Sequence, residues 1–366
     1  MANPQLWLLG QDLIAAGLIE ISSLPDVVER KGFYRESLVT NDYNFVCKNN
    51  DNYFTTGNPR SILNGINWLY ANMYYVDEND NTTWSGQVID INCNHRNKIA
   101  TVKTRDNLYK YIKDYIEYES ADWETASAAA QNIMSNQSFT AFNEPSFNDA
   151  HDYLDSLGAY LKCNINKSDK VTLFDALNNL GFYSCSDVYS HLGNVYFQTW
   201  REYPGGTSLR FNYDSDSRLK SYPIVSYLER EIINDYSIDY YGSGGTALTD
   251  ATGGNIGSTS RSKHGTHALE PWDTGIDKQY TFKDATTAQA IGELYIKRSH
   301  NDYSDKAMPL IKVQFDVDIR YKEDVTLESY FKQTLPEEGW DDKVFEVMEF
   351  RRNEAQNNIN IVGYEV

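Results

Sequence analysis

The stretch Asp284–Tyr321 reads DATTAQAIGELYIKRSHNDYSDKAMPLIKVQFDVDIRY, and it predicts one helix followed by one long strand. The side chain of Asp284 can cap a first helical turn, and apolar residues then recur at helical spacing from Ala288 to Tyr295. From Ile311 to Tyr321, apolar and polar residues alternate without a break. A strand with one buried and one solvated face is typical of an antiparallel sheet. Because nothing in this stretch is chemically reactive, the best-specified part of the chain is architectural.

The composition describes a folded, tyrosine-rich protein. A chain of 366 residues is long enough for two or three domains, and its hydrophobic content of 41% is ordinary for a folded protein. The aromatic content of 14% is high and includes 28 Tyr. Tyr suits both half-buried sheets and subunit interfaces. The excess therefore indicates either a β-rich fold or extensive contacts between subunits.

Charge and cysteine content disfavour several kinds of site. The formal net charge is −19, and no dense Lys/Arg run occurs, so we expect no specific nucleic-acid binding. An acidic surface fits either solubility or the wall of a channel through which a polyanion passes. No Cys-x-x-Cys and no zinc-type spacing occurs, so we expect free thiols at Cys47, Cys93, Cys163 and Cys185.

The N-terminal apolar run Leu6–Ile21 has no positive charge before it and is interrupted by Gln11 and Asp12. It predicts an amphipathic helix over Leu6–Leu18 rather than a signal peptide or a membrane span. No other stretch approaches spanning length. We therefore expect a soluble protein that is made in the cytoplasm and has no membrane span.

Strand and helix patterns alternate along the rest of the chain. Residues 121–194 predict a mainly helical segment, either an inserted subdomain or crossover helices within one domain. In it, Thr172–Asp175 resembles a capping box, and Gly181 stands where a glycine commonly follows a helix. The glycine-rich stretch 242–260 predicts a long flexible loop. Strands are expected within Arg35–Val46, Asn67–Val76, Trp84–Cys93, Ala100–Thr104, Val195–Trp200, Ile232–Tyr240, Val344–Phe350 and Asn358–Val366, and a further helix after Asp106.

These elements predict an α+β fold dominated by strands, with two small antiparallel β-barrel-like domains and an inserted helical segment. The hairpins near Trp84 and Trp340 share an aromatic start, an Asn-containing turn and a β-branched return, which indicates a weak internal duplication. The predicted domains are an N-terminal helix or anchor at 1–30, a first β-barrel with a helix at 31–120, a helical insertion at 121–194, and a second β-barrel at 195–366 that includes a flexible loop at 242–280.

Several pieces of the chain, in this order, resemble the hub proteins (minor tail or baseplate hub) of tailed bacteriophages and related injection machines. Ser37–Phe45 with Asn49–Phe54 is similar to the opening strand and turn of their first barrel, and Trp84–Ile91 is similar to that barrel's hairpin. Five further segments are similar to later helices and strands of that family. In chain order they are Thr172–Leu180, Gly193–Trp200, Ile233–Tyr240, Thr287–Leu294 and the closing hairpin to Val366. Residues 1–30 and the loop 242–260 have no counterpart in the resemblance.

The resemblance implies a structural protein of the virion tail. It implies a homotrimer whose three chains, with two similar barrels each, form a ring. Such a ring would adapt a six-fold tail tube or distal tail protein to a three-fold spike or tail fibre. It also implies no enzymatic activity, no cofactor, and no catalytic, cofactor-binding or metal-binding residues. The alternative is a glycan-binding or glycan-hydrolysing tail protein that uses exposed aromatic residues and paired acids.

The chemically suggestive residues each have a plainer interpretation. His264 and His267 could ligate a metal if they stood on a helix, but the Gly-Thr pair between them disfavours a helix, so we expect no metal site. Asp316 and Asp318 share one strand face and could serve glycoside hydrolysis, but a solvated strand face is the favoured explanation. The other acidic clusters are interpreted as loop charges, at Glu337-Glu338 and Asp341-Asp342.

Overall fold

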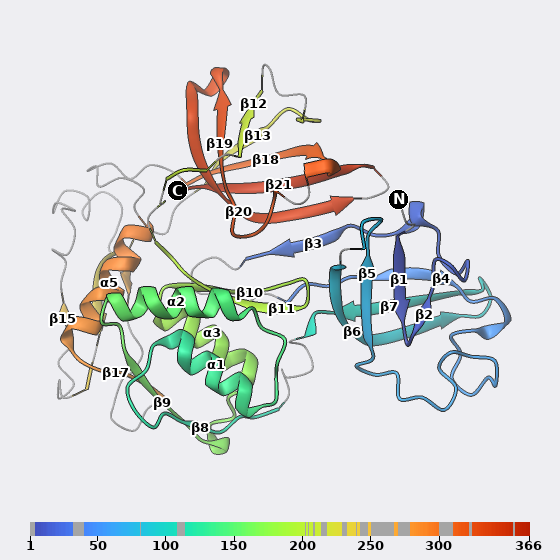
Figure 1. Cartoon of the computed structure of the whole chain (residues 1–366), viewed down its shortest axis with the longest axis horizontal. Coiled ribbons are helices and arrows are strands. Elements are labelled where there is room, and N and C mark those ends of the chain that lie inside the picture. Colours follow the sequence, from blue (N-terminus) through green and yellow to red (C-terminus); the bar gives the residue numbers. More distant parts are fainter. Residues whose placement is uncertain are drawn as a thin grey trace.

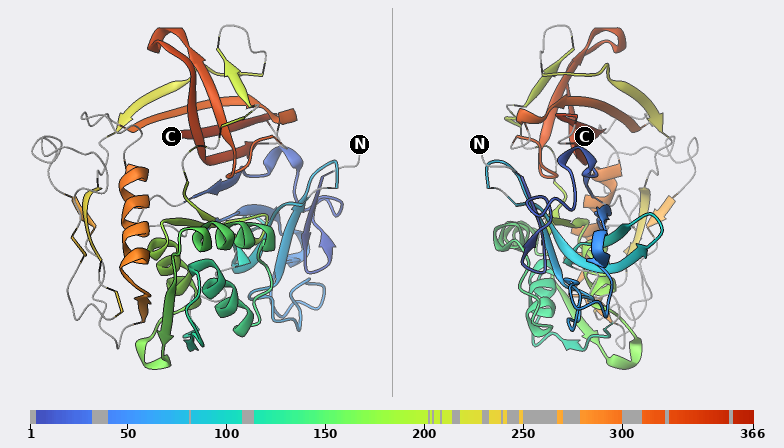
Figure 2. Two further views of the ribbon diagram at one scale, coloured as in Figure 1. Left: turned by 60° about the vertical axis from the view of Figure 1, so that its left-hand side comes forward. Right: turned by 90° about the vertical axis from the view of Figure 1, so that its right-hand side faces the viewer.

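The computed structural model has an α+β architecture dominated by strands, as the sequence predicts. Figure 1 shows a curled sheet at the top, a second sheet at the right, and a helical layer below them. Figure 2 shows the same three parts from two further sides. The structure describes residues 4–31, 40–80, 82–107, 114–201, 203, 205–207, 209–213, 218–228, 233–238, 240–241, 248–249, 267–269, 279–299, 310–321, 324–353 and 356–366.

The first sheet has six antiparallel strands, and its inner face forms a hydrophobic core that we call the six-stranded core. Trp84 and Tyr75 are fully buried in it, as the period-two pattern predicts. Gly86 lies under the Trp84 ring, where a Cβ would stand 2.2 Å from Cη2, so only glycine fits. The strand order is β2 (Gln11–Asp12), β1 (Gln5–Leu8), β5 (Asn72–Val76), β6 (Thr82–Asn94), β7 (Ile99–Arg105) and β4 (Phe45–Lys48).

The predicted helix over Leu6–Leu18 is wrong, because this segment forms β1 and β2 instead. The chain reverses at Leu9 and Gly10, whose φ angles of 50° and 77° interrupt any helix. Leu6 and Leu8 are both buried, which is a strand period, and β1 pairs with β5. A short apolar run fits either period, and here the turn at Gly10 decides between them. Whether residues 1–30 also anchor the chain to a neighbour stays a prediction.

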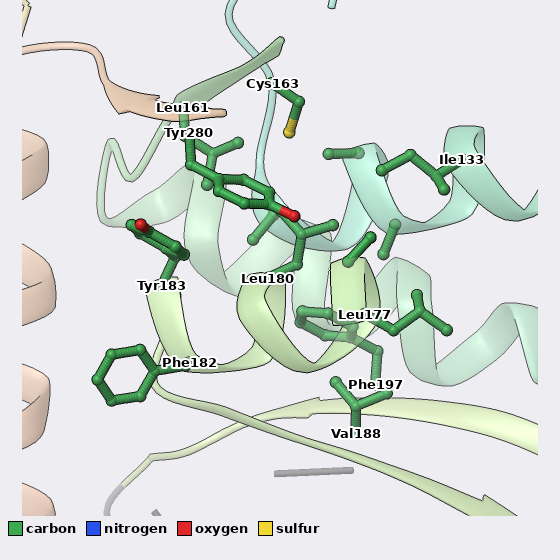
Figure 3. Packing of buried hydrophobic residues seen from close by; sticks show 14 of the residues in the cluster. Ile133, Leu161, Cys163, Leu177, Leu180, Phe182, Tyr183, Val188, Phe197 and Tyr280 are labelled. Carbon is green, nitrogen blue, oxygen red and sulfur yellow. The ribbon is translucent and has the colours of Figure 1, made fainter. Parts of the chain in front are cut away.

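The middle of the chain folds around a second core, which we call the helical core. Figure 3 shows Leu177 and Leu180 of the central helix between side chains from the surrounding elements. Three helices lie within 121–194, as predicted: α1 (Ala126–Asn136), α2 (Glu144–Ser156) and α3 (Leu173–Tyr183). Five strands accompany them: β8 (Tyr118–Glu119), β9 (Leu161–Ile165), β10 (Ser186–His191), β11 (Asn194–Thr199) and β17 (Tyr280–Phe282).

The start of α3 is as predicted, but its end is not. The Asp175 amide donates to Thr172 Oγ1 at 3.1 Å, and the Thr172 amide donates to Asp175 Oδ2 at 3.0 Å, which confirms the capping box. Gly181 does not follow the helix but lies inside it, and Ser184 is the C-cap. The helix continues past the glycine because Phe182 and the residue after it are buried in the helical core.

The helix predicted after Asp284 is α5 (Ala285–Ser299), and the Thr287 amide donates to Asp284 Oδ1 at 2.9 Å, as expected of a cap. Its apolar face, from Ala288 to Tyr295, is buried in the helical core. The helical core therefore gathers segments from both sides of the boundary predicted at residue 194. Hairpin β10–β11 also spans that boundary.

The third part is a seven-stranded sheet that curls around its own core, which we call the seven-stranded core. The predicted strand after Ile311 is confirmed as β18, but it ends at Asp318 because the Arg320 amide turns back onto the Asp318 carboxylate at 3.0 Å. The closing hairpin is confirmed as β20–β21. The order is β12 (Arg210–Asn212), β19 (Tyr330–Leu335), β20 (Trp340–Asn353), β21 (Asn358–Glu365), β18 (Leu310–Asp318) and β13 (Ile224–Leu228), with β3 (Val27–Arg30) also paired to β20.

The remaining predictions fall partly outside the described residues. Of the predicted strand Arg35–Val46, residues 32–39 lie outside them, and so do residues 108–113 of the helix expected after Asp106. The strand expected at Ile232–Tyr240 is present as β14, in a small sheet with two short strands from the predicted loop 242–280. Most of that loop lies outside the described residues. This sheet contains β15 (Leu248–Thr249), β14 (Ile233–Ile238) and β16 (His267–Leu269).

Candidate assembly interface

Hairpin β10–β11 lies between two of the three cores (Figure 1). Every side chain of β10 is buried, which is unusual for a hairpin because one face normally meets solvent. Val188 and Phe197 point into the helical core, where Figure 3 shows them below α3. On the opposite face, Tyr189 belongs to the seven-stranded core and stacks on Tyr196 with ring centroids 5.4 Å apart. The hairpin is therefore a wall shared by two cores.

Buried ion pairs fix this wall to elements distant in the sequence. Arg298 of α5 donates from Nη2 to Asp187 Oδ1 at 2.6 Å, and both side chains are nearly inaccessible. Lys31, which follows β3, donates from Nζ to Glu346 Oε1 of β20 at 2.7 Å and to Gln198 Oε1 of β11 at 2.9 Å. These pairs connect the hairpin to α5, to the seven-stranded sheet and to the N-terminal segment.

A third buried pair joins the hairpin to β3. His191 at the end of β10 contacts the Glu29 carboxylate, and the Leu192 amide donates to the other Glu29 oxygen at 3.3 Å. A buried charge is tolerated only when it is paired and hydrogen-bonded, and removing one partner typically costs about 3–5 kcal/mol. These buried pairs therefore favour a single arrangement of α5, β3 and β20 around the hairpin.

The tip of the hairpin reaches the six-stranded sheet. Leu192 and Gly193 form its two-residue turn with φ angles of 50° and 79°, the combination that a tight hairpin turn requires. A Cβ on Gly193 would stand 2.6 Å from Cβ of Ser85, so the backbone approaches this sheet closely. Asn107 Nδ2 donates to the Gly193 carbonyl at 3.0 Å, and Asn41 Nδ2 donates to the Ser190 carbonyl at 3.1 Å. One hairpin thus holds both large sheets in place.

The strand predicted at Val195–Trp200 is confirmed as β11, but β10 lies in the segment 121–194 that the sequence predicts as mainly helical, so its residues were missed. A signal was present, since Val188-Tyr189 and Val195-Tyr196-Phe197 flank the turn Leu192-Gly193 as two β-favouring runs. Asp187 and His191 stand in a strand that is otherwise apolar or hydroxylic. Their roles depend on partners far along the chain, which no local pattern reveals.

Asp316 and Asp318 do lie on one strand face, but both are engaged in local structure. Asn360 Nδ2 donates to Asp316 Oδ1 at 2.7 Å. Asp318 accepts from the Arg320 amide and side chain, and Lys220 Nζ lies 3.6 Å away. These hydrogen bonds from Arg320 lower the pKa of Asp318 to about 2. A general acid of a glycosidase needs a raised pKa, so Asp318 is unsuited to that role.

The other candidate residues carry no reactive cluster in the part of the chain that the structure describes. His264 lies outside it, and His267 stands in β16.

All four cysteines are free, as predicted, and burial raises the pKa of the Cys47 and Cys185 thiols to about 12. Glu337-Glu338 form a short turn after β19, as predicted, whereas Asp341-Asp342 follow Trp340 within β20, so the prediction of loop charges is wrong for them. The described residues contain no group of three or more potential metal ligands, and no described helix is long and apolar enough to cross a bilayer.

Exposed apolar side chains mark surfaces that are available to partners. At the edge of the seven-stranded sheet, β13 exposes Ile224 by 64% and Tyr227 by 54%. On the six-stranded sheet, Val46 of β4 is 48% exposed, and Tyr74 of β5 stacks with Trp7 of β1. Both large sheets therefore present apolar side chains on their outer surfaces.

No known protein-family profile matches the chain, and no curated protein matches its sequence. Solved structures match it over almost its whole length. The 43 kDa tail protein of prophage MuSo2 from Shewanella oneidensis matches with a TM-score of 0.55 at 12% identity, covering 99% of this chain and 97% of that one. A tail protein from Neisseria meningitidis MC58 matches with a TM-score of 0.58 at 11% identity, covering 100% and 96%. Prophage tail protein gp18 from Listeria monocytogenes EGD-e matches with a TM-score of 0.54 at 10% identity, covering 99% and 94%. The chain therefore has the fold of these tail proteins over its full length.

Proposed function

We propose that this protein is a structural component of a bacteriophage tail, located at the junction between the tail tube and the tail tip. Three chains form a closed ring that meets a six-fold tube or distal tail protein on one side and a three-fold spike or fibre on the other. The observation that carries the proposal is the full-length likeness to phage tail proteins, in a chain whose two large sheets are held by one hairpin.

The two sheets are alike in the features that the proposal needs. Each contains a long antiparallel hairpin whose first strand carries a buried tryptophan near its start, Trp84 in β6 and Trp340 in β20. Each hairpin carries one register shift, after Val88 in the first and after Val347 in the second. Three chains with two similar sheets each give six similar units around a three-fold axis, which is how one ring can match both symmetries.

A non-enzymatic role is consistent with the site chemistry. The paired acids on β18 are bound to neighbouring side chains, and the buried ion pairs hold elements together. The work of such a protein is done by interfaces, and a weak contact repeated around a closed ring gives a strong assembly. Within the glycan-directed alternative, the lowered pKa of Asp318 argues against the general-acid role for this residue.

Light scattering coupled to gel filtration tests the ring. With a chain mass of 42.0 kDa, the proposal expects a species of about three chain masses, and negative-stain class averages should show three-fold symmetry. Mass spectrometry of purified phage particles should find the chain among the tail proteins. A protein that remains monomeric at the highest accessible concentration and is absent from particles would overturn the proposal.

A further inference from the structure

Strand β13 is an edge strand without the usual protection against pairing. It forms hydrogen bonds only with β18 among the described strands, so its other side is free of a strand partner. Its five residues, Ile224 to Leu228, carry no charge, and none of them is fully buried. Ile224 pairs with Gln314 on the solvated face of β18, whereas Val225 packs on the seven-stranded core. Apolar side chains thus emerge on both faces of this edge, and one added strand would cover both.

The other sheet edges are shorter or guarded. Strand β2 has only two residues and ends in Asp12. Strand β12 has three residues, and its Arg210 pairs with Asp342 at 2.8 Å. Strand β4 has four residues and is covered at its end alone, where the Lys48 amide donates to the Leu18 carbonyl at 2.8 Å. Natural proteins protect edges by shortness, charge or cover, and β13 alone among these four lacks all three.

Acidic side chains flank the β13 edge. Tyr227 donates from its hydroxyl to Glu338, and this hydrogen bond raises the pKa of Tyr227. Tyr222 is 45% exposed, and its pKa is raised by burial first and then by a side-chain hydrogen bond to Glu337. Both glutamates are exposed, and no described basic side chain forms an ion pair with either. A partner strand at this edge should therefore bring positive charge.

The six-stranded sheet offers a matching surface at β4. The first half of β4 is open, and Val46 presents an exposed apolar side chain there. The Asn49 amide donates to the Lys98 carbonyl at 2.7 Å, which places the turn between β6 and β7 beside the end of β4. In that turn Arg96 and Lys98 are exposed, and neither forms an ion pair among the described residues. This edge therefore combines an apolar centre with a basic end.

We propose that β13 of one chain pairs with β4 of a second copy, head to tail, with Arg96 and Lys98 of the second copy beside Glu337 and Glu338 of the first. The contact joins unlike surfaces, so it propagates around a ring rather than closing a two-fold dimer. Main-chain hydrogen bonds supply the strand pairing, and the charges fix its register and exclude self-pairing of two acidic edges. The inference rests on the ring of the proposed function and assigns its contact surface.

Charge reversal tests the pairing. Glu337→Lys with Glu338→Lys should weaken assembly at least about tenfold in light-scattering titrations, because it brings two basic surfaces together. Arg96→Glu with Lys98→Glu should have the same effect from the other side. The chain that carries all four substitutions should assemble again, since each contact regains opposite charges. All these side chains are exposed, so circular dichroism melting should show an unchanged fold.

An edge-blocking variant provides an independent test. Ile224→Lys puts a charge at the start of β13, on its most exposed side chain, and should reduce assembly by at least as much as the glutamate reversals. Tyr115→Lys is the matched control, because Tyr115 is 51% exposed but lies in the helical part of the chain. Its assembly should equal that of the unaltered protein.

The outcomes separate this inference from the proposed function. If the unaltered chain is trimeric but neither reversal nor Ile224→Lys changes it, the β13–β4 contact is wrong and the proposed ring stands. If each reversal abolishes assembly but the combined variant does not restore it, the surfaces matter and the pairing between them is wrong. If the unaltered chain never assembles, the ring and this contact are both overturned.

Discussion

Hairpin β10–β11 and edge strand β13 both offer strands for contact, but they do so with opposite chemistry. The hairpin carries buried charges, each matched by a partner within the same chain, as in Asp187 with Arg298. Strand β13 carries exposed apolar side chains and no charge of its own. A contact within one chain has its partner present as soon as the chain folds. Such a contact can therefore bury charged side chains, which makes the folded arrangement specific. A contact between chains forms after folding, and each separate chain must remain soluble until then. Its charged side chains therefore stay exposed around the apolar contact surface.

The largest effect is expected at the hairpin. Asp187→Asn leaves the Arg298 guanidinium buried without its carboxylate, and we expect a loss of about 3–5 kcal/mol of unfolding free energy. Urea unfolding followed by fluorescence measures this. The control is Asp90→Asn, because Asp90 pairs with Lys103 at 3.2 Å with both side chains 40–46% exposed. That variant should lose no more than about 1 kcal/mol. Equal losses in the two variants would show that the hairpin pair is not special.

A paired replacement sharpens the same test. Asp187→Val combined with Arg298→Met removes both charges and keeps a similar summed volume. We expect the double variant to recover most of the stability lost in Asp187→Asn, because replacing a whole buried pair is far milder than breaking it. If the double variant is as unstable as the single one, shape and hydrogen bonding at this position matter more than charge balance.

The tip of the hairpin should show a smaller effect. Gly193→Ala must accommodate a Cβ 2.6 Å from Cβ of Ser85 at a φ of 79°, and we expect a loss of about 2–4 kcal/mol from strain and overpacking together. Gly10→Ala is the control, since Gly10 has a φ of 77° but no described atom within 4 Å of the added Cβ. It should lose only about 1–2 kcal/mol, from backbone strain alone. Thermal melts of both variants measure the difference. Identical shifts of the melting temperature would mean that the hairpin tip moves to accommodate the added Cβ without cost.

The sequence predicted what is local and failed where distant segments decide. Alternation along β18, the Asp284 cap and the capping box at Thr172 depend on residues within a few positions, and all three are found. The run from Leu6 to Leu18 was assigned the wrong period because a short apolar run fits both periods, and the reversal at Gly10 together with the pairing of β1 with β5 shows which side chains are buried. The hairpin site was invisible for the same reason, since Asp187 and Arg298 are separated by 111 positions. Edge strand β13 was missed because its lack of alternation resembles a loop.

A still smaller effect is expected at the start of α5, outside both surfaces under comparison. Asp284→Ala removes the acceptor of the Thr287 amide, and we expect a loss of about 1 kcal/mol in urea unfolding. Asp152→Ala is the contrasting variant, because Asp152 is exposed in the second half of α2, where Asp is a poor helix former and its negative charge opposes the helix dipole. That substitution should stabilise the protein by a few tenths of a kcal/mol. If both variants lose unfolding free energy, the carboxylate stabilises each helix in some way other than by capping, and the assigned cap is wrong.

The smallest effect is expected on the solvated face of β18, where exposed charges pair without burial. Hydrogen bonds from Arg320 lower the pKa of Asp318 from 3.8 to about 2. Because the folded pKa lies below the unfolded one, the stabilisation is present above about pH 4 and is lost as the pH falls towards 2. Salt should weaken it, since Arg320 is largely exposed. Carboxyl-carbon NMR titration measures the pKa directly, and Arg320→Gln should move it upward. A pKa near 6 would instead show that Arg320 does not hold Asp318 ionised, and would contradict the local pairing assigned to this face of β18.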